Sequence, residues 1–297
     1  MKRRKFLGAS AGVVMAASTL STQANPILTG PSPQRRGRIR QGLWQVNFGP
    51  DTALPLEEMC KIATHLGVKG FDLIDVKDWP LLRQYGLRPL MIGGDYVDFV
   101  NGIIHPEFHN RTESLVRPLI EICRDNNVAN MAFIAGKKRG MGEEQAMDNA
   151  VAFFNRIKTQ LEDNNVMAGL ENVNNLYDEP GYSRPDQVCG PFAWGVEMCR
   201  RVNSPNVKMI CDIYHLQMQD GNITRTIREH IDWITHFHVA GIPDRNEIDA
   251  TQEINYRYIA EVIAATNYAG YVSHEWRPGP GRDPIQSLMQ ALDIMDV

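Results

Sequence analysis

The feature of this sequence that most constrains its fold is an alternation, repeated eight times between Gln41 and Val297, of a short apolar run and a longer amphipathic stretch. The apolar runs are short and bounded by turn residues, as expected for strands of a parallel sheet that is buried on both faces. We expect the strands near Leu43–Val46, Gly70–Ile74, Arg88–Ile92, Asn130–Ile134, Val166–Leu170, Val207–Cys211, Ile234–Val239 and Gly270–Ser273.

The longer stretches carry apolar residues at three- and four-residue spacing, which is typical of helices that pack on one face. The clearest is Glu143–Glu162, in which Met147, Ala150, Phe154 and Leu161 fall on one side. Further helices are predicted at Leu56–Leu66, Arg111–Arg124, Asp186–Val202, Ile223–His230, Tyr256–Ala265 and Pro284–Ile294.

Alternating strands and helices predict a parallel sheet with helices outside it. The stretch 41–297 is close to the usual length of a (β/α)8 barrel, about 250 residues. A doubly wound open sheet is the competing architecture. It would favour a glycine-rich phosphate-binding turn after the first strand, and Val46-Asn47-Phe48-Gly49 is not such a turn. The sequence therefore predicts an α/β protein made of a single TIM-barrel domain.

The first 24 residues have the character of an export signal. Arg3 and Arg4 precede Phe6-Leu7 and an apolar stretch that ends near Leu20, which resembles the twin-arginine signal of bacteria. The stretch is shorter and less apolar than a membrane span of about 20 residues, although an uncleaved anchor helix is the alternative. We predict a periplasmic protein with three parts: a twin-arginine-type signal peptide (1–24), a linker (25–40) and a catalytic barrel (41–297).

Charge and cysteine content exclude several classes of protein. The formal net charge of −4 at pH 7 is weak for 297 residues, so a nucleic-acid partner is not expected. No stable membrane partner is expected after export, and the oligomeric state stays open. The five cysteines form no Cys-X-X-Cys pair and are odd in number, which indicates buried free thiols rather than a disulfide framework or a zinc–thiolate cluster.

Acidic residues and one histidine lie at the ends of the last four predicted strands. They are Glu171, Asp212, His238 and Glu275. The carboxyl ends of barrel strands converge on one mouth, so we expect these side chains at one level of the barrel. Taken singly, each has an ordinary alternative as a helix cap or a loop ion pair. Four in register on consecutive strands favour a shared site, because charged residues are rarely buried unless they are paired or bind a metal.

Three carboxylates and an imidazole directed at one point would repel one another without a cation. A bound divalent metal removes that cost, and this mixed set of ligands favours Mn²⁺ or Mg²⁺ and, less exclusively, Zn²⁺ or Co²⁺. Such a metal acts as a Lewis acid on an α-hydroxy-carbonyl compound and stabilises an enediolate. Glu171 and Glu275 lie on strands separated by two others, so we expect them to flank a substrate, one removing a proton and the other returning it.

Two further residues are candidates for substrate binding. His215 follows Asp212 by three residues, and Arg245 lies in the loop after the seventh predicted strand. An arginine there suits a carboxylate or hydroxyl groups, and the alternatives are a loop contact for the histidine and a solvated arginine. The remaining histidines near the strands, His230, His236 and His274, are expected to be structural.

Several segments resemble hydroxypyruvate isomerase, which belongs to the xylose isomerase-like barrel superfamily together with ketose 3-epimerases and inosose dehydratases. They are Gly169-Leu170-Glu171-Asn172-Val173-Asn174, Asp212-Ile213-Tyr214-His215-Leu216-Gln217, Glu253-Ile254-Asn255-Tyr256, Pro180-Gly181-Tyr182 and His274-Glu275-Trp276-Arg277-Pro278. The resemblance implies that Glu171 and Glu275 are both the proton-transferring pair and metal ligands. It also implies that Asp212 is a ligand and that His215 and Arg245 contact the substrate.

The resemblance leaves the substrate open in two ways. His238 matches a position where sugar epimerases use a histidine ligand and some hydroxypyruvate isomerases carry glutamine. After the third predicted strand, Met91–Tyr96 lacks the His-Asn-rich segment of the family. We therefore predict a metal-dependent isomerase of the aldose–ketose type, an intramolecular oxidoreductase acting on a small sugar or hydroxy-keto acid. The alternatives are a ketose 3-epimerase or related epimerase or dehydratase, and a non-enzymatic periplasmic sugar-binding barrel.

Overall fold

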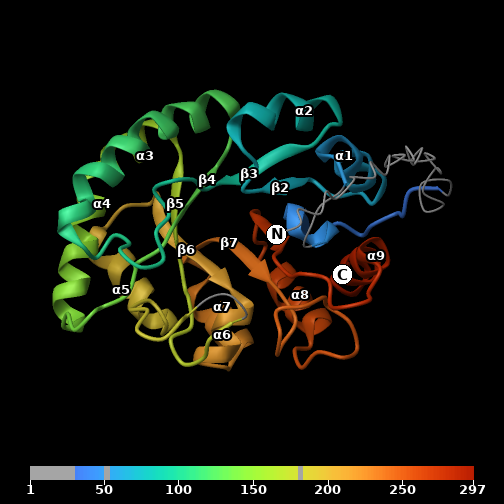
Figure 1. The fold of residues 1–297 in the computed structure, drawn as a ribbon. Coiled ribbons are helices and arrows are strands. Elements are labelled where there is room, and N and C mark those ends of the chain that lie inside the picture. Colours follow the sequence, from blue (N-terminus) through green and yellow to red (C-terminus); the bar gives the residue numbers. More distant parts are fainter. Residues whose placement is uncertain (1–30, 50–53, 180–182) are drawn as a thin grey trace, which may run out of the picture. The chain divides into compact units, whose positions relative to one another are not determined.

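A computed structural model describes residues 31–49, 54–179 and 183–297 (Figure 1). Eight strands pair in parallel, in sequence order, and close into a barrel. Their bounds are β1 Arg40–Leu43, β2 Gly70–Asp72, β3 Arg88–Ile92, β4 Asn130–Phe133, β5 Met167–Glu171, β6 Val207–Asp212, β7 Ile234–Val239 and β8 Tyr271–His274. The predicted single-domain TIM barrel is confirmed.

Helices follow the strands and surround the barrel (Figure 1). The α-helices are α1 Leu56–His65, α2 Trp79–Gln84, α3 Pro106–Asn126, α4 Glu143–Asn164, α5 Phe192–Val202, α6 Ile213–Gln219, α7 Ile223–His230, α8 Tyr256–Ala265 and α9 Pro284–Ile294. Short 3-10 helices lie at η2 Gln45–Phe48, η3 Val76–Asp78 and η4 Ile231–Trp233. Within the described residues, no helix combines the length and apolar character needed to cross a bilayer.

Several predicted boundaries were wrong for local reasons. β1 begins three residues before the predicted strand, because its buried Gln41 and Gly42 give no apolar signal. Helix α3 begins at Pro106 instead of Arg111, since a proline in the first turn already has the backbone angle that a helix needs. Helix α5 begins at Phe192 instead of Asp186, with Pro191 as its N-cap.

The interior is filled by large apolar side chains and contains all five cysteines. On the α4 side, the rings of Phe133, Phe153 and Phe154 pack with centroids 5.4–6.0 Å apart. The cysteines are free and buried, as predicted. Burial raises the pKa of the Cys60 thiol to about 11 and that of the Cys123 thiol to about 12, so these thiols stay protonated near neutral pH.

Strand register places the carboxyl ends of the last strands level with one another. Asp212 of β6 pairs directly with His238 of β7, and Val239 pairs with His274, the residue before Glu275. On β2, Gly70 is required because a Cβ there would collide with the carbonyl oxygen of Arg88 on β3. This close approach of β2 and β3 positions the end of β2 at the same mouth.

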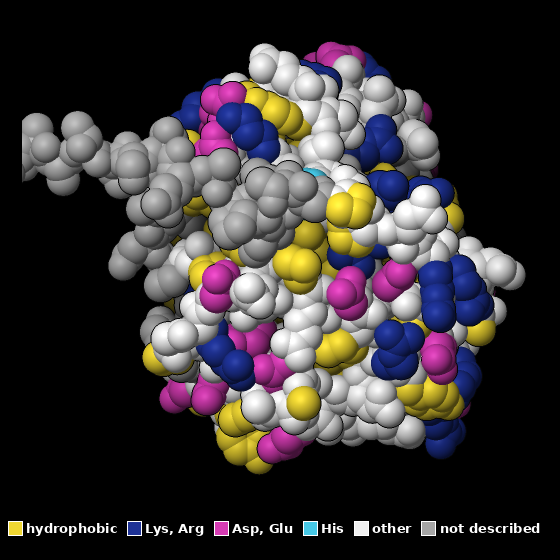
Figure 2. Space-filling model, turned by 90° about the vertical axis from the view of Figure 1, so that its right-hand side faces the viewer, with side chains coloured by type: hydrophobic (Ala, Val, Ile, Leu, Met, Phe, Trp, Pro, Cys, Tyr) yellow, Lys and Arg dark blue, Asp and Glu magenta, His cyan; other side chains and the backbone are white. Residues whose placement is uncertain are grey.

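The predicted signal peptide (1–24) lies outside the described residues. Of the predicted linker, residues 31–40 are described, and Arg35 contacts the barrel. Its Nε donates to the carbonyl oxygen of Leu66 at 2.7 Å, and its Nη1 pairs with Asp293 at 3.0 Å. On the face shown in Figure 2, acidic and basic side chains are interspersed with hydrophobic ones.

Candidate metal centre

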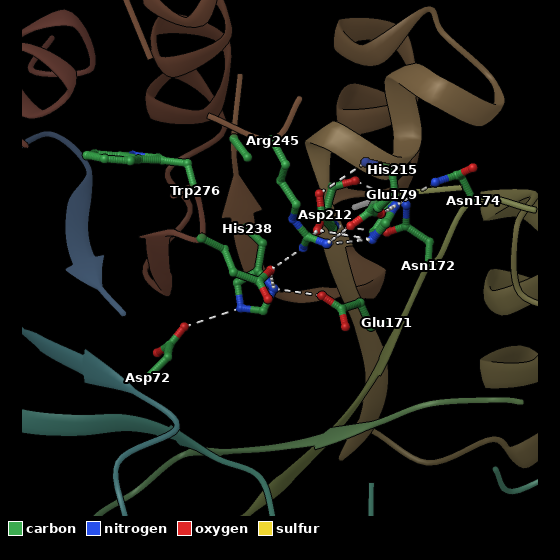
Figure 3. A network of polar contacts seen from close by, with 12 residues as sticks. Asp72, Glu171, Asn172, Asn174, Glu179, Asp212, His215, His238, Arg245 and Trp276 are labelled. Atoms are coloured by element: carbon green, nitrogen blue, oxygen red, sulfur yellow. Dashed lines mark hydrogen bonds and ion pairs between the residues drawn. The ribbon is translucent and has the colours of Figure 1, made fainter. Parts of the chain in front are cut away.

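The four strand-end residues predicted from the sequence meet at the mouth of the barrel (Figure 3). Glu171 and Asp212 end β5 and β6, His238 lies one residue before the end of β7, and Glu275 follows β8 directly. One potential ligand atom from each lies within 4.8 Å of the others. Asp212 and His238 are almost fully buried, so water does not screen the charges of the cluster.

The side chains of the cluster point inward at one another. His238 Nδ1 lies 2.7 Å from Glu171 Oε1 and 2.8 Å from Glu275 Oε2. From the opposite side, Arg245 Nη2 donates to Asp212 Oδ2 and to Glu275 Oε2, both at 2.8 Å. Asn172, the residue after Glu171, holds β5 and β6 level, since its side chain exchanges two hydrogen bonds with the backbone of Asp212.

Electrostatics within the cluster favour a bound cation. Burial, reinforced by the negative charges of Glu275 and Glu171, raises the pKa of Asp212 to about 7, against the opposing effect of Arg245. Burial alone would also raise the pKa of Glu275, but Arg245 and His238 hold it below its usual range. Asp212 is thus a buried carboxylate whose charge Arg245 only partly compensates, and a bound cation would offset the remaining cost of burial.

The donor set fits a divalent metal. Three carboxylates and one imidazole nitrogen are ligands that Mn²⁺, Mg²⁺ and Zn²⁺ accept, and the four atoms are already gathered. The buried His/Asp/Glu cluster is therefore consistent with a metal site.

Asp72, at the end of β2, holds His238 in place. Asp72 Oδ2 lies 3.2 Å from His238 Nε2 and 2.8 Å from His236 Nε2, and Ser273 Oγ lies 3.1 Å from the same nitrogen of His236. The His238 ring contacts carboxylates through both nitrogens, and the charge of Glu275 together with hydrogen bonds to Asp72, Glu171 and Glu275 raises the pKa of His238 well above its usual range despite burial. With a metal in place of the Nδ1 proton, the carboxylate of Asp72 would keep the proton on Nε2 and so fix the orientation of the ring. The charges of His236 and His238 hold the pKa of Asp72 at about 2 despite its burial, so it stays ionised.

Replacement of Asp72 by asparagine is expected to weaken Mn²⁺ binding about 10- to 100-fold, because the histidine ligand loses the partner that fixes its tautomer and orientation. Calorimetric titration of the metal-free protein measures this. The control is Asp78→Asn, which makes the same change on the same side of the barrel in a residue outside the cluster. Equal Mn²⁺ affinity in Asp72→Asn and the unaltered protein would show that Asp72 does not position the ligand.

Arg245 is buried rather than solvated. Its side chain spans the cluster, with Nη1 donating to Glu179 Oε2 at 2.9 Å while Nη2 contacts Asp212 and Glu275. Glu179 is fixed in turn by Arg184, whose Nε and Nη2 donate to its two carboxylate oxygens at 3.0 and 3.1 Å. The Arg245 guanidinium also lies 5.3 Å from the centroid of the Tyr214 ring. These contacts hold a cationic group rigidly beside the carboxylates.

His215 lies behind Arg245. Its backbone N–H donates to Asp212 Oδ1 at 3.1 Å, so Asp212 also caps α6. A helix cap was the alternative role considered for this residue in the sequence. Asn174 Nδ2 lies 3.0 Å from His215 Nδ1, and Arg245 Nη1 lies 3.3 Å from His215 Nε2. Both of these neighbours are donors, so a neutral ring accepts a hydrogen bond from only one of them. Burial and the charges of Arg245 and Arg184 hold the pKa of His215 well below its usual range, so the ring is neutral.

A cavity of about 620 Å³ opens over the cluster. Glu171, His238, Arg245 and Glu275 line it, whereas His215 and Asp212 are not among its lining residues. The predicted site residues are thus brought together, with the two glutamates and Arg245 facing the cavity and His215 supporting them from behind.

Sequence reasoning missed Asp72, Glu179 and Arg184. Asp72 lies inside the predicted strand Gly70–Ile74, whereas the observed β2 ends at Asp72, so the misplaced strand end concealed the signal that selected the other four residues. Glu179 and Arg184 lie in an irregular segment after β5, and their pairing depends on a loop path that no periodic pattern reveals.

Comparison with known proteins gives one family match. The model of the family described as "Xylose isomerase-like TIM barrel" matches residues 79–295. A putative hydroxypyruvate isomerase of Danio rerio is 30% identical over 146 residues, which are 48% of this chain and 50% of that protein. A 2-oxo-tetronate isomerase of Cupriavidus necator is 35% identical over 109 residues, 36% of this chain and 39% of that protein. The chain thus spans half or less of the length of these relatives.

A solved structure extends the likeness to almost the whole fold. The 3-keto-D-glucoside 4-epimerase of E. coli superposes with a TM-score of 0.71 over 86% of this chain and 98% of that one, at 17% sequence identity. At that identity the likeness concerns the fold alone.

Proposed function

Because this chain belongs to the xylose isomerase-like TIM barrel family, we propose that it is a metal-dependent isomerase that moves a proton between adjacent carbons of a small hydroxy-carbonyl compound. The observation that carries the proposal is the convergence of Glu171 and Glu275 on His238 Nδ1, with all three residues lining one cavity. The names of the two curated relatives, both isomerases, support the same reaction class.

In this proposal, Glu171, Asp212, His238 and Glu275 hold a divalent cation, most suitably Mn²⁺ or Mg²⁺. When bound, it would polarise the adjacent oxygens of the substrate and stabilise the charge that develops as a carbon-bound proton leaves. Asp72 would orient His238 for this task. The set of ligands alone does not decide between these metals and Zn²⁺ or Co²⁺.

Proton transfer is assigned to the two glutamates. Glu275 is kept ionised by Arg245 and His238, so it is able to accept a proton from carbon, and Glu171 faces it across the same cavity floor. One glutamate removes the proton from one face of the substrate and the other delivers a proton to the neighbouring carbon. Which glutamate acts first depends on the direction in which the substrate lies.

Arg245 is assigned to substrate binding. Its Nε is buried without a hydrogen-bond partner in the described part of the chain, and the residue lines the cavity. A substrate oxygen would satisfy this donor, and a charge-assisted bond of this kind is stronger than a neutral one. His215 is proposed to act with it from behind, through the contact between its Nε2 and Arg245 Nη1 at 3.3 Å.

Epimerisation is the second candidate reaction, since it needs the same pair of glutamates. It is favoured by the histidine at position 238. The structural neighbour is itself a 3-keto-D-glucoside 4-epimerase. A non-enzymatic sugar-binding barrel is the third. It would bind a sugar without any exchange of carbon-bound protons.

Proton exchange in D₂O tests the proposal. The full chain with Mn²⁺ is incubated with hydroxypyruvate and, separately, with a set of ketopentoses and ketohexoses, and NMR follows deuterium at carbon and the appearance of product. We expect deuterium incorporation with at least one compound and its loss on addition of chelator. Sugar binding without deuterium incorporation by the metal-loaded protein would contradict an enzymatic role.

We further propose that residues 1–24 direct export to the periplasm, on the basis of Arg3-Arg4 and the apolar stretch after them. N-terminal sequencing of the chain recovered from the periplasm of an expressing bacterium tests this. A start at Asn25 supports the proposal, whereas an intact chain retained in the cytoplasm contradicts it.

A further inference from the structure

The cavity over the cluster is larger than a three-carbon or four-carbon acid requires. Its volume of about 620 Å³ falls within the range of about 300–1,000 Å³ that is typical of sites for drug-sized ligands. The charged groups that would meet a hydroxy-carbonyl substrate occupy its floor. Most of the remaining lining belongs to the β2–β3 side of the barrel and to α3.

The wall on that side is mostly apolar, although Asp75 and Asp95 also belong to the lining. Leu73 and Ile92 line it from the ends of β2 and β3, and Leu115 and Leu119 line it from α3. Leu73 packs against the buried cluster formed by Met91, Ala132 and Ile210, so this wall is anchored on the core of the barrel. Ile92 lies on a strand and Leu115 and Leu119 lie on a helix, so these parts of the wall belong to regular secondary structure.

The apolar wall is only partly covered by the protein itself. Leu73, Leu115 and Leu119 are half-buried, and Val76, also in the lining, has 36% of its surface exposed. Aliphatic side chains gathered around a concave surface gain free energy when an apolar group displaces water from them. A free sugar, with hydroxyl groups all round, would instead lose hydrogen bonds to water without recovering them from aliphatic neighbours.

We infer that the substrate has two unlike ends: an oxidised sugar, carrying a ketone beside a hydroxyl, joined by a glycosidic bond to an apolar group about as large as a benzene ring. The sugar end meets Glu171, Glu275 and Arg245, and the apolar group lies against Leu73, Leu115 and Leu119. This inference rests on the proposed function for its polar end and on the shape and chemistry of the cavity for its apolar end.

A matched pair of ligands tests the apolar end. The probes are methyl β-glucoside and phenyl β-glucoside, in each of which one ring hydroxyl has been oxidised to a ketone. Each probe is titrated calorimetrically into the Mn²⁺-loaded full chain. Burial of the phenyl ring is expected to make the phenyl compound bind about 10- to 100-fold more tightly. Equal affinities, or no binding of either compound, would overturn the inference.

Substitutions locate the effect. Leu119→Asp is expected to remove the preference for the phenyl compound and to leave the affinity for the methyl compound within about twofold. Leu115→Asn provides a second, milder change in the same wall. The matched control is Val100→Asp, at a residue that is 47% exposed and outside the cavity lining, and it is expected to keep the preference. Unchanged Mn²⁺ binding shows that each variant is folded, and a preference that survives both wall variants would contradict the assignment.

The outcomes separate this inference from the proposed function. Phenyl preference without deuterium exchange in the bound sugar would uphold the substrate class and refute the isomerase. Deuterium exchange in hydroxypyruvate, together with equal affinities for the two glucosides, would uphold the isomerase and refute the substrate class.

Discussion

Replacement of Glu275 or of Glu171 by glutamine is expected to lower the rate of deuterium incorporation at carbon by about 10²- to 10⁴-fold, the usual contribution of a general acid or base. Glutamine keeps the shape of the side chain and one oxygen that can contact a metal, but it does not accept a proton. Both residues face the cavity and contact His238 Nδ1, so each change removes one side of the proposed pair.

Initial rates of exchange, with metal content measured on the same samples, test this expectation. The matched control is Glu253→Gln, at an exposed glutamate away from the cavity lining, and it is expected to retain the full rate. If both cavity variants exchange protons at the unaltered rate with metal bound, the glutamates are not the acid and base. If the rate falls only in proportion to lost metal, their role is ligation alone.

Removal of the divalent cation by a chelator is expected to lower turnover at least about 10³-fold and to destabilise the fold. The loss of turnover follows because Arg245, the cationic group that remains, supplies less charge to the substrate oxygens than a divalent cation does. The loss of stability follows because the cluster then keeps two buried carboxylates and a partly buried one near one imidazole and one guanidinium. At metal concentrations 100 to 1,000 times the dissociation constant, binding adds about 3–4 kcal/mol to the free energy of unfolding.

Thermal unfolding with and without Mn²⁺, paired with rate measurements, checks both parts. Asp212→Asn gives a matched comparison, because it removes one charge of the cluster and should reduce the Mn²⁺-dependent rise in melting temperature. A chelated protein that keeps its rate and its melting temperature would contradict a metal-dependent mechanism.

Several elements could be predicted from the sequence with accurate bounds. The strands Arg88–Ile92 and Ile234–Val239 and the helices Ile223–His230 and Tyr256–Ala265 were predicted at their observed limits. Buried parallel strands and amphipathic helices repeat a local pattern, so the sequence is sufficient for them. The four strand-end residues followed from the same repeat, since register in a barrel brings equivalent positions level.

What could not be predicted depends on contacts distant in sequence. Helices α2 and α6 span less than two helical turns, which is too short to show a repeating apolar pattern. Helix α6 also begins where Asp212 serves both as a cap and as a member of the cluster. The tether from Asp72 to His238 joins residues 166 positions apart. The apolar wall of the cavity requires α3 to lie beside the ends of β2 and β3, which only the closed barrel determines.

Anomalous diffraction from crystals of the Mn²⁺-loaded chain tests the central claim most directly, because it locates the cation without reference to activity. We predict one strong manganese peak at the barrel mouth, within coordination reach of Glu171, Asp212, His238 and Glu275. A manganese-loaded crystal with no peak among these four side chains, or with its peak at another site, would contradict it.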